Sequence, residues 1–413
     1  MKKRLFVPFF FILLTMAFFN SSVVFPADKP PKEIKIGASL AITGPFSVEW
    51  GPPTLKYSQA LESMVNERGG IYVKEYNTRL PIKLIIYDDG SSPDRSVELY
   101  EKLATVDKVD FFIGPESSPI LIKASTVAEK YGIPMIGSCG NSPYIFARGF
   151  KWLVGVDMPA PQWGETYYSM LKHFMDTKQL PRLKTVAIIK EETPHTMDMG
   201  LGAEHYAGIA DMKVVFAEKI PQGLNDFSSI IIKLKALKPD IVYVATWSST
   251  GATFAKQAYE TGFKPFDLHI PHVCLTLAWY KKVGPEIAEG VTGITHIANF
   301  KSGDVELYNG AIKKTGLGPY DLGIPPNRFL SLEVLLKGIE KAGTLDRAKV
   351  MEAIKNLRYQ ALHGEMFFRF GVDVAGKKCD GVGNKVVYMA QLQGGEIKVL
   401  WPLELVEGKF KRR

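Results

Sequence analysis

The sequence predicts an α/β fold of two doubly wound parallel-sheet lobes joined by a three-strand hinge. Short apolar strands alternate with helices about every 25 residues, and this order builds parallel sheets. The alternation stops at the Pro-rich stretch 157–161 and starts again at Thr185. Later segments return to one lobe or the other. We therefore expect the chain to cross between the lobes three times, near residues 156, 290 and 370.

The first lobe is predicted from four strands and the helices between them. The dipeptide Ser92-Pro93 marks one helix start, because Ser is a favoured cap and Pro a favoured first residue. Gly69-Gly70 marks the end of an earlier helix. The expected strands are Ile34–Leu40, Ile82–Tyr87, Val109–Ile113 and Ile133–Ile136, and the expected helices include Pro53–Asn66 and the apolar-periodic segment after Ser118.

The second lobe repeats the pattern from Thr185 onward. Its expected strands are Thr185–Ile189, Lys213–Ala217, Asp240–Ala245 and Leu268–Ile270, and its expected helices are Met199–Ala210, Phe227–Leu237 and Gly251–Thr261. We place the strand Gly290–Thr295 and the helix Phe329–Lys341 back on lobe one, and the hairpin of Lys385–Gln391 and Ile397–Trp401 on lobe two. Lobe one is then 33–156 plus 291–370, and lobe two is 157–290 plus 371–405.

The bulk composition is that of a globular protein with room for two domains. Of the 413 residues, 46% are hydrophobic and 23% are charged. The formal net charge is +8, and no Lys/Arg block is interleaved with aromatic residues, so we expect no nucleic-acid partner. Cys139, Cys274 and Cys379 are too few for a disulfide scaffold. The sequence leaves undecided whether a single disulfide forms, for example between Cys274 and Cys379.

The first 27 residues have the pattern of a secretory signal peptide. The basic stretch 2–4 precedes an uncharged apolar run from Leu5 to Phe19. That run is short for a membrane span, which needs about 20 residues, and an uncleaved membrane anchor is the alternative. Cleavage after Ala27 would leave an exported protein of net charge 8 − 3 = +5.

Two polar turns follow neighbouring strands of lobe one, at Gly114–Ser118 and at Gly137–Ser142. Both lie just past the carboxyl end of a strand, which is where open α/β sheets bind ligands. Both also precede a helix, whose free N–H groups and positive dipole end suit an anionic group. The sequence therefore predicts a ligand site with an anionic head at this edge of the sheet.

Short motifs at strand ends and turns follow one another in a characteristic order. They are Ile36–Pro45, Gly69–Ile71, Tyr87–Asp89, Gly114–Ser118, Pro143–Gly149, Asn225–Ser228 and Pro239–Tyr243. Together they resemble the periplasmic substrate-binding proteins of ABC transporters, in the leucine/isoleucine/valine-binding group with the type I fold. The resemblance covers nearly all of the chain after the signal.

The resemblance implies which residues hold the ligand. In this family lobe one binds the carboxylate and ammonium of an amino acid, and lobe two closes over the side chain. The positions that match the family's site are Trp50, Ser117, Ser118, Cys139, Asn141, His195, Trp247 and His272. The family's acidic partner for the ammonium should lie near Pro271-His272, where this chain has no Asp or Glu. The ligand is therefore expected to be a hydrophobic amino acid, the family's default, or an apolar or aromatic carboxylate or amide.

Simpler interpretations of these residues stay open. Ser117 and Ser118 are also favoured helix caps, and Trp50 and Trp247 could be ordinary half-buried aromatic residues. Two histidines without a carboxylate make a poor zinc site, so we expect no metal. We also expect no cofactor.

These observations predict a periplasmic solute-binding protein that captures a small carboxylate-bearing ligand by hinge closure and delivers it to an ABC permease. We expect a monomer. A ligand-sensing receptor subunit for an amide or amino acid is the alternative. The motifs G-x-S-x-G, H-E-x-x-H and G-x-x-x-x-G-K-[ST] are absent. Only Cys139 with His195 offers a nucleophile–base pair, and we expect no enzyme activity.

Overall fold

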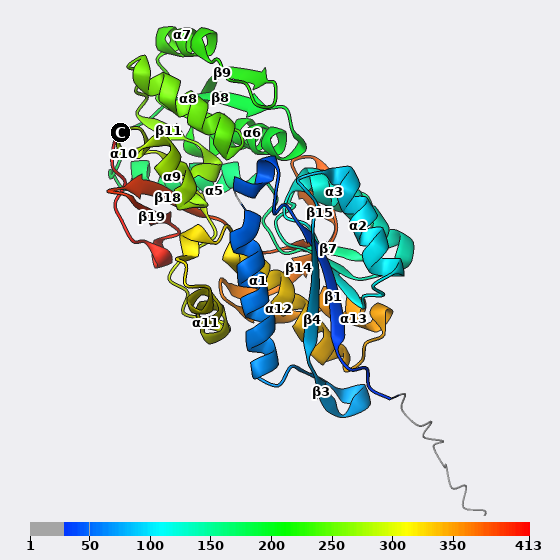
Figure 1. Ribbon diagram of the computed structural model, residues 1–413. Coiled ribbons are helices and arrows are strands. Elements are labelled where there is room, and N and C mark those ends of the chain that lie inside the picture. Colours follow the sequence, from blue (N-terminus) through cyan, green and yellow to red (C-terminus); the bar gives the residue numbers. More distant parts are fainter. Residues whose placement is uncertain (1–28, 49) are drawn as a thin grey trace, which may run out of the picture.

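The protein is built from two α/β lobes stacked one above the other (Figure 1). The computed structural model describes residues 29–48 and 50–413, so the signal predicted for residues 1–27 lies outside the described part. Within the described part, no helix is both long enough and apolar enough to cross a membrane. The predicted fold class is confirmed.

The first lobe contains an eight-stranded sheet in the order β13-β14-β17-β7-β6-β5-β1-β4. The strands from β17 to β4 run parallel, whereas β14 and β13 pair antiparallel at one edge. The bounds are β1 Ile34–Leu40, β4 Ile82–Asp88, β5 Phe111–Ile113, β6 Met135–Gly137, β7 Leu153–Gly155, β13 Arg358–Ala361, β14 Gly364–Arg369 and β17 Val382–Gly383. Two separate hairpins pair β2 (Ile71–Val73) with β3 (Thr78–Leu80), and β15 (Val372–Val374) with β16 (Lys377–Cys379).

Helices cover both faces of this sheet, as a doubly wound fold requires. One hydrophobic core joins one face of the strands to α1 (Gly51–Glu67), α11 (Val305–Thr315), α12 (Pro325–Ala342) and α13 (Arg347–Lys355). A second core joins the other face to α2 (Pro93–Thr105), α3 (Ser118–Tyr131) and α4 (Pro143–Phe146). The predicted cap of α2 is confirmed, because the Ser92 hydroxyl accepts a hydrogen bond from the Arg95 N–H at 3.3 Å.

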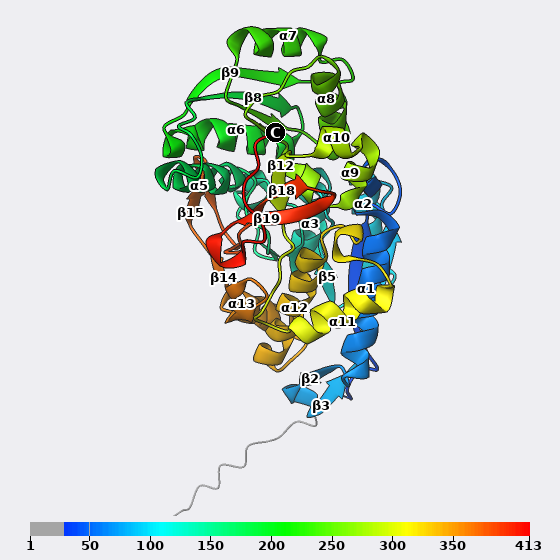
Figure 2. The same cartoon turned by 90° about the vertical axis from the view of Figure 1, so that its left-hand side faces the viewer.

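The second lobe contains a seven-stranded sheet in the order β19-β18-β12-β11-β10-β8-β9 (Figure 2). The bounds are β8 Thr185–Glu191, β9 Lys213–Ile220, β10 Ile241–Ala245, β11 Asp267–His269, β12 Thr292–Thr295, β18 Tyr388–Gln393 and β19 Glu396–Trp401. One face carries α5 (Gln162–Asp176) and α6 (Pro194–Tyr206). The other carries α7 (Ser228–Leu237), α8 (Ser248–Glu260), α9 (Leu277–Val283) and α10 (Pro285–Ala288). The predicted hairpin on lobe two is confirmed as β18 and β19.

Two placements expected from the sequence are wrong. The strand expected at 290–295 was assigned to lobe one, but β12 pairs with β11 through His269 and Thr292, and with β18 through Thr292 and Gln391. Strand β17, inside the segment expected on lobe two, pairs with β7 and β14 of the first sheet. The second and third crossings therefore follow β12 and β17, later than the expected positions near 290 and 370. These pairings join segments far apart in sequence, so no local pattern reveals them.

Candidate functional site

A closed cavity lies between the lobes, where strands of both sheets end. Its empty space is about 270 Å³, and every side chain that lines it is at least nine-tenths buried. Seven of the eight residues predicted from the sequence line it, namely Trp50, Ser117, Ser118, Cys139, His195, Trp247 and His272. The other lining residues are Glu116, Asp157, Trp163, Leu275, His296 and Ile324.

The turn after β5 brings two hydroxyls to the cavity. Ser118 begins α3, and its Oγ accepts hydrogen bonds from the backbone N–H groups of Asn141 at 3.0 Å and Ser142 at 3.1 Å. Ser118 therefore ties the two polar turns together. Ser117 is 2% exposed, and its Oγ has no hydrogen-bond partner among the described residues. A buried hydroxyl that lines a cavity without a partner is available to a ligand.

Asn141 is the predicted residue that does not line the cavity. Its side-chain amide donates to Asp157 Oδ2 at 3.1 Å and to the Met158 carbonyl at 2.9 Å. The amide nitrogen thus supports the carboxylate that borders the cavity.

Aromatic rings from both lobes meet at the mouth of the cavity. Trp247 is the N-cap residue of α8 in lobe two, and its ring centroid lies 4.8 Å from that of Phe46 and 6.2 Å from that of Trp50 in lobe one. Trp247 Nε1 donates to Thr193 Oγ1 at 3.2 Å, whereas Trp50 Nε1 is buried without a partner among the described residues. This ring cluster forms a contact that opening the lobes would break.

Two histidines of lobe two bond to each other beside Trp247. His195, in the first turn of α6, and His272, after β11, have their Nε2 atoms 2.9 Å apart, and His272 Nδ1 lies 2.9 Å from the Thr246 carbonyl oxygen. Burial holds the pKa of His195 well below 6.5, with a further contribution from His272. Burial also lowers the pKa of His272 to about 4, against the effect of the Thr246 carbonyl. Both rings are therefore neutral at pH 7.

A buried ion pair lies behind the first turn. Arg328 of α12 is 4% exposed, and its Nη1 lies 3.5 Å from Glu116 Oε1. Arg328 Nε donates to Ser58 Oγ at 2.9 Å. Neither carboxylate oxygen of Glu116 has a hydrogen-bond partner among the described residues. Sequence reasoning missed this pair, although a Glu inside the turn motif and an Arg at the edge of an apolar helix were both visible.

Three titratable side chains meet beside the cavity, one from each crossing between the lobes. We call Asp157, His296 and Lys385 the hinge triad, since they follow β7, follow β12 and precede β18 respectively. Asp157 Oδ1 lies 3.6 Å from Lys385 Nζ and 3.7 Å from His296 Nδ1, and the Lys385 ammonium donates to His296 Nδ1. Sequence reasoning missed the triad because His296 and Lys385 are 89 residues apart.

Burial dominates the electrostatics of the hinge triad. It raises the pKa of Asp157 to about 6, although Lys385 opposes the shift. It also lowers the pKa of Lys385, with Asp157 opposing. Burial, together with the Lys385 charge, holds the pKa of His296 well below 6.5. At pH 7 the triad therefore contains the Asp157 carboxylate and the neutral His296 imidazole.

The cysteines take no part in a disulfide, because all three are buried free thiols. Cys139 lines the cavity, where burial and the nearby Glu116 and Asp157 carboxylates raise the pKa of its thiol well above 9. A thiol held protonated is a poor nucleophile. The His195 imidazole, its proposed base, is already bonded to His272.

Comparison with known proteins gives the family. A family model described as periplasmic binding protein matches residues 33–396. This chain belongs to that family. The family consists of solute-binding proteins, is extracytoplasmic, and associates with ABC transporters. A curated relative is the Leu/Ile/Val-binding protein BraC3 of Rhizobium johnstonii, 24% identical over 328 residues, which are 78% of this chain and 84% of that protein.

Solved structures of the periplasmic binding protein fold match the whole arrangement. LivJ of Streptococcus pneumoniae in complex with isoleucine has a TM-score of 0.73 at 18% identity, covering 90% of this chain and 100% of its own. A solute-binding protein of R. palustris in complex with benzoate has a TM-score of 0.68 at 18% identity, covering 92% and 98%. At this level of identity the match establishes the two-lobe fold.

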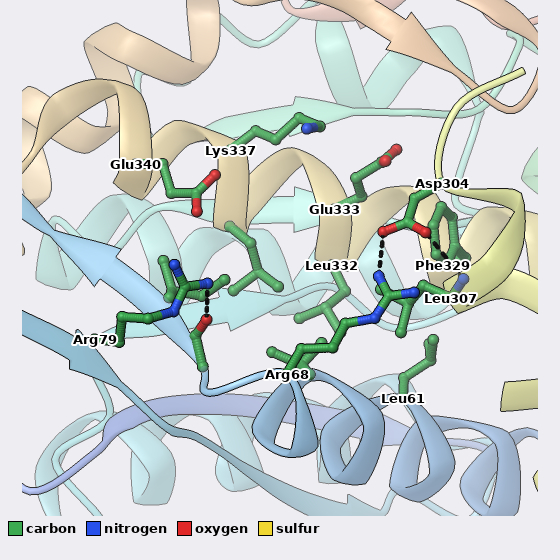
Figure 3. Close-up of a pocket in the computed structure, with 14 residues that line it drawn as sticks. Leu61, Arg68, Arg79, Asp304, Leu307, Phe329, Leu332, Glu333, Lys337 and Glu340 are labelled. Atoms are coloured by element: carbon green, nitrogen blue, oxygen red, sulfur yellow. Dashed lines mark hydrogen bonds and ion pairs between the residues drawn. The ribbon is translucent and has the colours of Figure 1, made fainter. Parts of the chain in front are cut away.

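A larger pocket lies on lobe one (Figure 3). It has about 670 Å³ of empty space between α1, β2 and α12. Its charged rim is engaged within the protein, because Arg68 Nη1 lies 2.6 Å from Asp304 Oδ2, and Arg79 Nη2 donates to the Gly70 carbonyl at 2.7 Å. None of the sequence-predicted site residues lines it. We therefore place the candidate site in the smaller cavity between the lobes.

Proposed function

We propose that this protein is the extracytoplasmic solute-binding component of an ABC importer and that it captures a small carboxylate-bearing ligand between its lobes. The observation that carries the proposal is the closed cavity lined by buried donors without partners. Ser117 Oγ and Trp50 Nε1, both on lobe one, are two such donors among the described residues. A buried polar group without a partner costs about 1–3 kcal/mol, so a ligand that bonds to both would stabilise the closed form.

The ligand's head fits the lobe-one wall. The Ser117 and Ser118 hydroxyls follow β5 at the start of α3, where backbone N–H groups and the helix dipole favour negative charge. Ser118 accepts two backbone N–H groups, which leaves its own proton free to donate. These features support a carboxylate at this wall.

The ligand's body fits the aromatic surroundings. Trp50, Trp163 and Trp247 line the cavity, and the lobe-two wall brings neutral imidazoles where the family's acid was expected. The space left free between the lining side chains is small, which favours a compact molecule. We therefore propose an apolar or aromatic carboxylate ahead of a hydrophobic amino acid. Benzoate and isoleucine in the two solved relatives represent these two classes.

Capture proceeds by closure rather than by chemistry. The closed form is held by the contact of Trp247 with Phe46, and by the Ser142 hydroxyl, which donates to Asp198 Oδ2 at 2.5 Å across the lobes. A ligand shifts the equilibrium toward closure only if it binds the closed form more tightly than the open one. We propose that a single copy of the chain carries out this step, without catalysis, and that the permease recognises the closed form.

A thermal-shift screen of the chain without residues 1–27 tests the proposal. The panel is leucine, isoleucine, benzoate, hydroxybenzoates, dicarboxylates and benzamide. A ligand at 100 times its dissociation constant stabilises by about 2.7 kcal/mol. Ser117→Ala should weaken binding of the hit, whereas Ser249→Ala on the exposed surface of α8 should not. The absence of a shift with every compound would contradict the proposal.

A further inference from the structure

The hydrogen bonds of the lobe-two histidines fix where each proton lies. The Thr246 carbonyl can only accept, so His272 Nδ1, 2.9 Å away, must carry a proton. Because the His272 ring is neutral, its Nε2 is an acceptor. His195 Nε2, 2.9 Å from it, must then be the donor. Since the His195 ring is also neutral, its Nδ1 is left with a lone pair and no proton.

That lone pair has no partner in the part of the chain that the structure describes. His195 is 4% exposed and lines the cavity, and its Nδ1 is buried with no hydrogen bond among the described residues. The chain of bonds from Thr246 through His272 thus ends in an unused buried acceptor on a residue that lines the cavity. Moving the proton of His195 from Nε2 to Nδ1 would break the hydrogen bond to His272, so that hydrogen bond keeps Nδ1 an acceptor.

The third cavity histidine has the opposite character. His296 Nδ1 bonds with the Lys385 side-chain nitrogen, and with the lysine as the donor the proton of the neutral ring lies on Nε2. This Nε2 is also buried without a partner among the described residues. The cavity therefore has a donor at the hinge, alongside the Ser117 and Trp50 donors of lobe one, and an imidazole acceptor on lobe two.

We propose that His195 Nδ1 is a specificity-determining acceptor that selects ligands with an uncharged hydroxyl on the part covered by lobe two. The inference deepens the proposed function and rests on it. The preferred ligand is then an apolar or aromatic carboxylate that carries a hydroxyl group. Its carboxylate meets the donors of lobe one and the hinge, and its hydroxyl donates to His195.

The surroundings of His195 favour a hydroxyl over an ammonium. The cavity residues of lobe two are Trp163, His195, Trp247, His272 and Leu275, and none carries a charge at pH 7. A cation placed there would lose its hydration without gaining a counter-ion on that wall. An uncharged hydroxyl loses much less and still satisfies the acceptor.

A matched ligand series tests the inference. Dissociation constants are measured by calorimetry for benzoate, 3-hydroxybenzoate, 4-hydroxybenzoate and 4-methoxybenzoate. We expect one hydroxybenzoate to bind at least about tenfold more tightly than benzoate, since sites built to bond a hydroxyl discriminate strongly against analogues that lack it. The methoxy compound, which cannot donate, should bind no better than benzoate.

Substitutions test whether the preference for a hydroxyl depends on the hydrogen-bonded pair His195 and His272. His195→Phe should bring the ratio between the hydroxybenzoate and benzoate constants close to one, whereas His205→Phe, at an exposed position on the same helix, should leave it unchanged. His272→Phe frees the His195 ring to take either tautomer, so it should reduce the ratio. A ratio unaffected by His195→Phe would overturn the inference.

Imidazole ¹⁵N NMR of the ligand-free protein provides a readout that does not depend on ligand choice. We expect a proton on Nε2 of His195 and on Nδ1 of His272. The reverse tautomer at His195 would overturn the inference. Equal binding of benzoate and both hydroxybenzoates would overturn it and leave the proposed function standing. No binding by any carboxylate would overturn both.

Discussion

The two walls of the cavity differ in charge and in how they are held. The lobe-one wall contains the Glu116–Arg328 ion pair and two serine hydroxyls, and its turns are bonded to each other through Ser118. The lobe-two wall consists of neutral rings, and its Trp247 contacts Phe46 of the other lobe. The first wall keeps its internal bonds when the lobes separate, whereas the second loses contacts.

This difference assigns separate tasks to the walls. On the proposed function, the polar wall can bind the charged head before closure, because its two turns are bonded to each other through Ser118. On the same proposal, the neutral aromatic wall contributes only once it covers the ligand, so we expect it to discriminate among ligand bodies and to favour closure. The hinge triad lies where the two walls join, and it holds the three crossings together.

The largest effect is expected from breaking the hinge triad. Lys385→Met leaves the Asp157 carboxylate buried without its cation, and such a loss costs about 3–5 kcal/mol. Urea unfolding should report a loss of that size. Lys172→Met, which removes an exposed partner of Asp176 on α5, should change stability by less than about 1 kcal/mol. Equal effects of the two substitutions would mean that the triad does not join the walls.

The neutral wall should also make stability depend on pH. The pKa of His272 is about 4 in the folded protein and about 6.5 when unfolded. The unfolded chain therefore binds more protons between these values, and stability present above pH 6.5 is lost as the pH falls toward 4. Between pH 7 and pH 4, the free energy of unfolding of the His272→Gln variant should fall by about 3 kcal/mol less than that of the wild type. His205→Gln serves as the control, and urea unfolding at each pH is the measurement.

Substitutions of the two serines of the lobe-one wall should distinguish a structural role from a ligand-binding role. Ser118→Ala leaves two buried N–H groups without an acceptor and should cost about 1–3 kcal/mol of stability. Ser117→Ala removes a hydroxyl without a partner, so stability should change by less than about 0.5 kcal/mol. Ligand affinity should fall in both variants. A stable Ser118→Ala protein would show that the two turns do not depend on this hydroxyl.

The smallest effect is expected at the contact between the walls. Aromatic pairs contribute about 0.5–1.5 kcal/mol beyond area burial, so Phe46→Leu should weaken ligand affinity by up to about tenfold. Trp247→Ala should weaken it further, and the double variant should reveal a coupling of that size. A coupling near zero would mean that the rings touch without favouring closure.

Sequence reasoning succeeded where the signal is local. The α/β alternation and the cap at Ser92 are confirmed, and so is the position of the two turns after β5 and β6. Seven of the eight candidate residues line one cavity, although their contact with a ligand stays a prediction. They come together because carboxyl ends of parallel strands share an edge of the sheet.

Sequence reasoning failed where partners are distant. The pairing of β12 with β18 joins Thr292 to Gln391, and nothing near residue 290 signals it. Asn141 has the right turn position, yet its amide points to Asp157. A turn motif fixes where the backbone lies, whereas the direction of a side chain depends on neighbours supplied by other segments.

The sequence by itself determined the repeating strand–helix order, the family and the two turns that offer hydroxyls, because each depends on residues close together in the chain. Only the tertiary structure decided that three crossings bring together Asp157, His296 and Lys385, and that a carbonyl at Thr246 sets the proton positions of His272 and His195. Proton positions and buried charges depend on which groups lie within hydrogen-bonding distance, and folding brings those groups together from remote parts of the chain.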